Sequence, residues 1–160
     1  MKLGQLTILA ALMSLAAVAP ASAAPSTASG SVALALAGVV APYSPLPAAE
    51  KKAVATLFNG NSNVAYKKKI TVTSDKIVCR ASNVDITSRS CELTFGSHSR
   101  TVKGAEANAI FATEALAGVP SDGAAGTIFE ALSKLSCTLD PKVIKDNSGG
   151  GADCTFEPGN

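Results

Sequence analysis

The chain has 160 residues, with 14 basic and 12 acidic side chains, few aromatic residues and no tryptophan. This near-neutral balance gives no electrostatic reason to expect nucleic acid or anionic lipid as a partner, and the length suits one small domain. A core built mainly from Ala, Val, Ile and Leu buries less area per residue than one rich in Phe and Trp, so covalent cross-links would help to stabilise it.

Residues 1–23 have the three parts of a secretory signal peptide. Lys2 provides the positive start, the run 3–19 is mostly apolar, and the small residues at 21–23 suit cleavage. The apolar run is short for a membrane span, and no cysteine lies near the cut for lipid attachment. We therefore expect cleavage after Ala23, export to the periplasm or beyond it, and a mature chain of the remaining 137 residues with no membrane span.

Residues 24–45 are expected to precede a disulfide-linked α+β domain over 46–160. The stretch 24–31 is small and polar and is predicted to be a mobile leader. The apolar stretch 32–40 fits either a strand or one face of a helix, and its alanine content favours a helix. After a proline-rich loop, a further helix is expected from Pro47 to about Phe58.

The pattern then changes to β-branched and alternating residues, which predicts an antiparallel meander. The turns are expected at 74–75, in the polar loop between the second and third strands, and at 96–99. The four strands are expected at 64–73, 76–81, 91–95 and 100–103.

From Gly104 the period becomes helical. A helix is expected up to Gly118, and a second one from Ser121 to about Leu135, so that the two form an αα-hairpin. The tail returns to strands at 135–139 and 153–156. The predicted fold class is α+β: one small domain with about four to six antiparallel strands, packed by the αα-hairpin and holding two disulfides.

The four cysteines form an even set in a chain that is expected to be exported, which indicates disulfides. Their spacings are too long for a zinc site, and no C-x-x-C redox motif is present. Three pairings are possible. We favour Cys79–Cys91 and Cys137–Cys154, because each closes a short segment with strand-like flanks.

The densest run of charge is Lys67-Lys68-Lys69. If the run lies in a strand, Lys67 and Lys69 project from one face and Lys68 from the other. The lysines then either contact an anionic protein or polysaccharide partner, or protect an edge strand from aggregation.

Other polar groups offer weaker candidates for chemistry. His98 is the single histidine and lies in a predicted turn, where a solvated side chain is the ordinary interpretation. Glu106, Glu114 and Glu130 fall on the predicted helical hairpin and could pair as acid and base, or simply occupy its exposed face. The loop 146–153 holds acidic and glycine residues but lacks the spacing of a calcium loop. No cofactor or metal site is predicted.

The sequence therefore favours a non-enzymatic binding module of the cell envelope or extracellular space, such as an inhibitor or accessory factor, with a protein or polysaccharide partner. One alternative is a small hydrolase using paired carboxylates. Another is a small-molecule carrier with an apolar cavity between the sheet and the helical hairpin. That cavity would be lined by Ile110, Phe111, Ile128 and Phe129.

Overall fold

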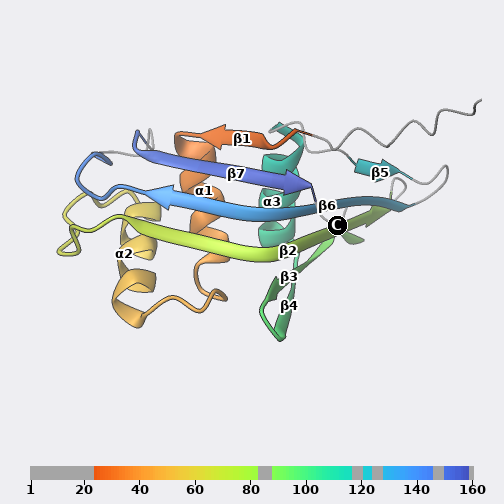
Figure 1. The fold of residues 1–160 in the computed structure, drawn as a ribbon, viewed down its shortest axis with the longest axis horizontal. Helices are drawn as coiled ribbons and strands as arrows, with labels where there is room; N and C mark the ends of the chain where they lie inside the picture. The colour runs from red at the N-terminus through yellow and green to blue at the C-terminus, as the bar shows by residue number, and fades with distance from the viewer. Residues whose placement is uncertain (1–23, 83–87, 117–120, 124–127, 146–149, 159–160) are drawn as a thin grey trace, which may run out of the picture.

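Seven strands form one antiparallel sheet within the residues that the structure describes, and three helices cover one of its faces (Figure 1). The structure is a computed structural model that describes residues 24–82, 88–116, 121–123, 128–145 and 150–158; at 81–82, 114–116, 121–123, 128–132 and 158 it describes the backbone alone. The elements are β1 (Ser26–Ser29), α1 (Ser31–Val40), α2 (Ala48–Phe58), β2 (Ile70–Ser82), β3 (Ser90–Phe95), β4 (His98–Lys103), α3 (Ala105–Leu116), β5 (Ser121–Gly123), β6 (Ile128–Leu139) and β7 (Ala152–Pro158).

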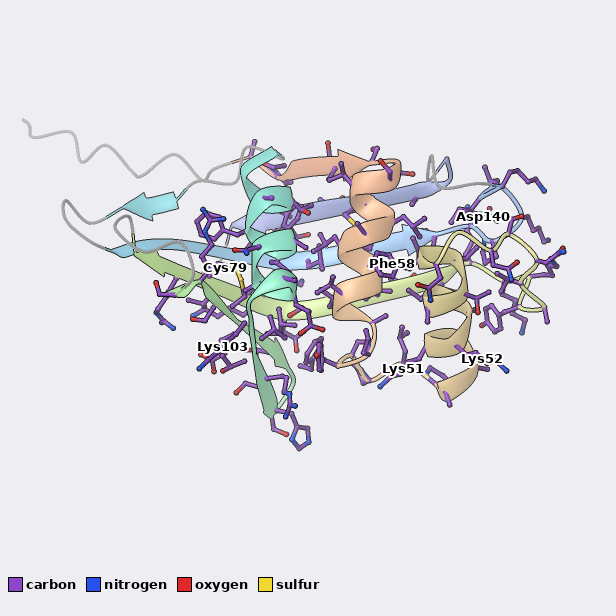
Figure 2. The ribbon with its side chains drawn as sticks, turned by 180° about the vertical axis from the view of Figure 1, so that it is seen from behind. Lys51, Lys52, Phe58, Cys79, Lys103 and Asp140 are labelled. Atoms are coloured by element: carbon purple, nitrogen blue, oxygen red, sulfur yellow. A yellow bond between two sulfur atoms is a disulfide. The ribbon has the colours of Figure 1, made fainter. Side chains whose placement is uncertain are left out.

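The strands lie in the order β1-β7-β6-β2-β3-β4, and β5 pairs with β6 outside this path. On the covered face, α1 lies between α2 and α3 and also contacts β7 (Figures 1 and 2). The main core forms where the buried residues of α1 and α3 meet alternate residues of the central strands. The predicted α+β class is confirmed.

The segment before α1 is built into the sheet, so the expectation of a mobile leader over 24–31 is wrong. β1 pairs with β7 in a register that sets Ser26 opposite Phe156. Gly30, at φ 70°, then turns the chain into α1 while its backbone N–H donates to the carbonyl of Ala152 at 2.9 Å. The expected helix at 32–40 is confirmed, because α1 buries the apolar face that includes Leu34 and Leu36.

The expected helix after Pro47 is confirmed as α2, and it docks on α1 at a glycine. A Cβ atom on Gly38 would lie only 2.5 Å from Cγ of Phe58, the last residue of α2. The absence of a side chain at position 38 therefore lets the two helices approach each other closely.

The predicted strands 64–73 and 76–81 are corrected to one strand, β2, that begins at Ile70 and continues through the expected turn at 74–75. A β-bulge between Ser74 and Ile77 takes the place of that turn. The hydroxyl of Ser74 lies 2.9 Å from the carbonyl oxygen of Lys76 and 3.0 Å from that of Thr94, which stabilises the irregular stretch.

The hairpin of β3 and β4 has a tighter turn than expected. The strand at 91–95 is confirmed, but only Gly96 and Ser97 form the turn, and Gly96 has a positive φ of 59°. His98 consequently begins β4 opposite Phe95 and does not lie in a turn.

The second helix of the predicted αα-hairpin does not form. The first helix is confirmed as α3, but residues 128–135 belong to β6, which pairs with β2 from Ser82↔Ile128 to Ile70↔Leu139. In the described half of β6, Leu135, Cys137 and Leu139 are buried while the residues between them are exposed. Burial of every second residue is the pattern of a strand with one covered face. Pairing with β2 therefore overrides the helical propensity of the same stretch.

Both predicted disulfides are confirmed, and each joins directly opposed residues of neighbouring strands. Cys79–Cys91 links β2 to β3, and Cys137–Cys154 links β6 to β7. The Sγ of Cys91 contacts the carbonyl oxygen of Ala107 in α3 at 3.7 Å, and the Sγ of Cys154 contacts that of Ala33 in α1 at 3.5 Å. Each disulfide is therefore packed between the sheet and a helix.

None of the helices in the described residues is long and apolar enough to cross a membrane. The predicted signal peptide at 1–23 lies outside the described residues and stays a prediction.

Candidate functional site

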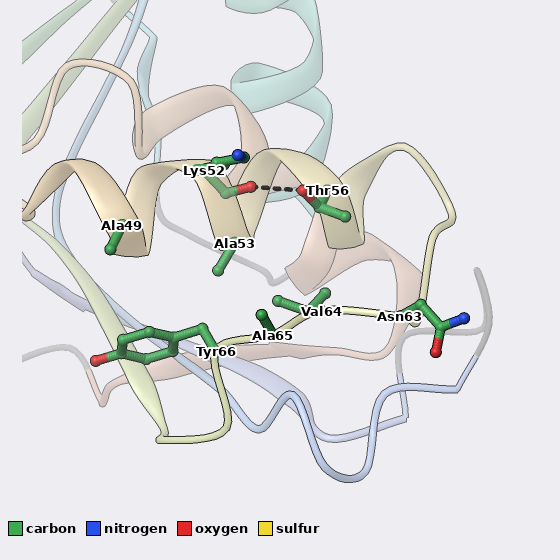
Figure 3. Close-up of a pocket in the computed structure, with 8 residues that line it drawn as sticks. All are labelled: Ala49, Lys52, Ala53, Thr56, Asn63, Val64, Ala65 and Tyr66. Carbon is green, nitrogen blue, oxygen red and sulfur yellow. Dashed lines mark hydrogen bonds between the residues drawn. The ribbon is translucent and has the colours of Figure 1, made fainter.

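A groove of about 580 Å³ lies between α2 and the chain segment that precedes β2 (Figure 3). Ala49 and Ala53 of α2 point across it towards Val64 and Ala65. Ala53 and Val64 are buried and form its floor, whereas Ala49 and Ala65 are exposed. Its volume falls in the range typical of ligand sites, and most of its surface is apolar.

Polar side chains form the rim of this groove. Lys52 and Thr56 line it from α2, and Asn63 and Tyr66 line it from the opposite segment. The Thr56 hydroxyl donates to the carbonyl oxygen of Lys52 at 2.7 Å, so it is already engaged within the helix. Lys52 is exposed, and no ion pair joins its ammonium group to a described carboxylate.

The groove is set in a strongly basic stretch of chain. Between Ala49 and Lys69 there are five lysines and one glutamate. Lys51 donates to the carbonyl oxygen of Pro42 at 3.0 Å, and Lys69 lies 4.0 Å from a carboxylate oxygen of Asp140. These contacts are exposed and weak, so they leave the surface positive.

The single glutamate of this stretch is engaged by a tyrosine. The hydroxyl of Tyr66 donates to Oε1 of Glu50 at 2.6 Å, which fixes the ring against the start of α2. This hydrogen bond, followed by burial and by the charge of Glu50, raises the pKa of Tyr66 above 10.0. The carboxylate of Glu50 is therefore held by Tyr66, a residue that lines the groove.

The lysines that sequence reasoning selected follow the last lining residue of this groove, Tyr66, and do not lie in a strand. Lys67, Lys68 and Lys69 follow Tyr66 directly, are exposed, and precede β2. The ladder of β2 and β6 ends at Ile70↔Leu139, because the partner chain turns at Asp140-Pro141. The expected alternation of lysine faces and the edge-strand role are therefore wrong.

The remaining candidates do not assemble a catalytic site in the described residues. His98 is exposed on β4, and no hydrogen bond joins it to a described serine or carboxylate. Glu106 receives the hydroxyl of Tyr43 at 3.0 and 3.1 Å from its two oxygens. Glu130 lies on β6 and not on a helix, so the expected carboxylate pair on facing helices does not form, while the side chain of Glu114 lies outside the description.

Tyr43 and Glu106 instead tie the loop after α1 to α3. Burial, followed by the hydrogen bond to Glu106 and its negative charge, raises the pKa of Tyr43, while Arg100 opposes the shift. The guanidinium carbon of Arg100 lies 5.7 Å from the centre of the Tyr43 ring. This cluster is a structural contact between two helical segments and the β3–β4 hairpin.

Of the two other hypotheses for binding sites, the loop 146–153 lies partly outside the described residues, at 146–149, and stays untested. Asp153 of the 146–153 loop accepts a hydrogen bond from Ser29 at 2.7 Å, and no cluster of three or more metal-ligating side chains occurs where side chains are described. Ile110 is fully buried in the core, and Ile128-Phe129 belong to β6, so the helical pair expected to line a carrier cavity does not exist.

Sequence reasoning missed the walls of the groove because it placed 64–73 in one strand. One signal was available: three consecutive lysines break the alternation that resumes only at Ile70 and Val72. The contribution of Ala49 and Ala53 could not be predicted from the sequence, because it depends on how α2 packs against residues 63–66.

Comparison with known proteins finds no matching family model, no similar curated protein and no similar solved structure. Any statement about function therefore rests on the groove itself.

Proposed function

We propose that this chain is an exported, non-enzymatic binding module of the envelope or extracellular space that holds an anionic macromolecule at the groove beside α2. The observation that carries the proposal is the combination of an apolar floor at Ala53 and Val64 with a surplus of lysines around it. An anionic partner would gain both long-range attraction and burial of apolar surface there.

Export is part of the same proposal. It is supported by the signal-like features of residues 1–23 and by two disulfides, which persist in oxidising compartments. The absence of free cysteines in the described residues fits a chain that matures in such a compartment.

Affinity capture tests the binding function. The tagged protein, expressed with residues 1–23 included and purified with both disulfides formed, is incubated with envelope and culture extracts, and retained macromolecules are identified. We expect a near-stoichiometric partner with the wild type and its loss with Lys67→Glu/Lys68→Glu. Lys103→Glu/Lys134→Glu reverses the same number of charges elsewhere, on β4 and β6, and should retain the partner.

Figure 2 shows Lys103 well away from Lys51 and Lys52, and neither Lys103 nor Lys134 lines the groove, so the control leaves the groove's lining unchanged. Equal loss of the partner in both variants would mean that only the overall charge matters. No partner retained by the wild type above a reduced and alkylated sample would contradict the proposed function.

A further inference from the structure

One wall of the groove is a stretch of backbone that has no partner strand. Residues 64–69 lie outside every helix and strand, and segment 63–66 runs along α2 in Figure 3. Among the described residues, the amides and carbonyls of Ala65, Tyr66 and Lys67 form no backbone hydrogen bond. Ala65 and Lys67 are exposed and Tyr66 is half-buried, so an incoming chain can approach a backbone here that has no partner of its own.

A polypeptide is the kind of partner that uses such a wall. An extended peptide laid beside an unpaired segment gains main-chain hydrogen bonds, and pockets for alternate side chains give it specificity. Here every second side chain of the peptide would face Ala53 and Val64, whose aliphatic surface suits an aliphatic side chain. Sugar hydroxyls would be left without partners against this floor.

The charges around the groove indicate which side chains the other face of a bound peptide would carry. Lys52 stands at the rim, and Lys67 and Lys68 follow the unpaired wall without an ion pair to any described carboxylate. Glu50 is held by Tyr66, so the acid within this stretch does not reach into the groove. Carboxylates on the outer side of a bound peptide would complement these lysines.

We propose, building on the binding function above, that the groove takes an extended acidic peptide segment of alternating aliphatic and acidic residues. The segment pairs its backbone with Ala65–Lys67, inserts aliphatic side chains between α2 and Val64, and directs carboxylates towards Lys52 and Lys67–Lys68. This names the partner as a protein with such a segment and not as a polysaccharide.

Titration of the isotope-labelled protein with a capped ten-residue peptide of alternating Val and Glu tests the inference by NMR. We expect shifts confined to α2 and residues 63–69, and slower hydrogen exchange at the amides of Ala65–Lys67. The same peptide with Lys in place of Glu should not bind. Polyglutamate and polygalacturonate serve as anions that lack the alternating aliphatic groups.

Three variants separate the contributions. Lys67→Glu/Lys68→Glu should weaken the peptide about tenfold, through the loss of two exposed charge contacts. Ala49→Trp fills the groove from an exposed position of α2 and should also weaken the peptide while leaving the binding of polyglutamate unchanged. Lys103→Glu/Lys134→Glu should bind the peptide about as tightly as the wild type.

The outcomes distinguish this inference from the broader function. Polyglutamate or polygalacturonate binding as tightly as the peptide, with no effect of Ala49→Trp, would overturn the peptide inference and leave an anion-binding surface. Unchanged exchange at Ala65–Lys67 in the bound state would overturn backbone pairing. A failure of the binding function itself appears separately, in the capture experiment, as no partner on the wild type.

Discussion

Gly38→Ala provides the sharpest test of how α2 is positioned. The added Cβ would lie 2.5 Å from Cγ and 2.7 Å from Cδ2 of Phe58, so the ring or the helix must move. Overpacking of this kind costs about 1–3 kcal/mol, whereas alanine in a helix interior is favoured over glycine by about 1 kcal/mol. The expected net effect is a destabilisation of about 1 kcal/mol.

A second substitution reverses the sign of that effect. In a Phe58→Ala background only the Cβ of residue 58 remains, 3.0 Å from the new methyl group, and a small adjustment accommodates it. The helix preference then dominates, and Gly38→Ala becomes neutral or stabilising. Urea unfolding of the wild type, the two single variants and the double variant gives the coupling energy. An equal loss of stability in both backgrounds would refute the reasoning that Phe58 is what requires glycine at position 38.

Three further predictions concern the second disulfide, the two tyrosines and the predicted signal peptide. Removing the second disulfide by Cys137→Ala/Cys154→Ala should lower the free energy of unfolding by about 3 kcal/mol, since its ends are 17 residues apart; a loss close to zero in urea would contradict this. The raised pKa values of Tyr43 and Tyr66 mean that the folded protein keeps these protons longer than the unfolded chain, so stability should fall as the pH rises above 10.0. Phenolate absorbance should show both tyrosines titrating later in the folded protein than in urea, and the Tyr66→Phe variant should lose part of the alkaline decline. Intact mass should show removal of residues 1–23 and four thiols only after reduction; an uncut chain or free native thiols would contradict the predictions of export and of two disulfides.

The sequence predicted best those features that are set by local chemistry. Pro47 and the residues after it defined α2, and the cysteine spacing with its strand-like flanks led to both disulfides. The helix at 32–40 followed from its alanine content, although a strand fitted the same apolar pattern. In each case the deciding information lay within the element itself or within 17 residues of it along the chain.

The errors occurred where a distant partner decides the structure. Residues 128–135 carry a helical pattern, but β2 offers them a long ladder, and burial on alternate residues follows from it. The reverse applies to 64–69, which looks like a strand but loses its partner where β6 ends at Leu139. The same difference applies to the candidate groove. Its lysines could be identified from the sequence, but its apolar walls could not, because they depend on contacts between distant segments.

The placement of β1 also has a consequence for how the protein is made. β1 is the first described strand, and among the described residues it pairs only with β7, the last. Until β7 is available, β1 has no ladder, Cys137 lacks its native disulfide partner Cys154, and an edge of β6 stays open. Pairing between such distant segments is slow because a long loop must close first. The sheet and its second disulfide are therefore completed only once β7 has been synthesised, and until then the thiol of Cys137 and the unpaired edge of β6 are open to non-native partners.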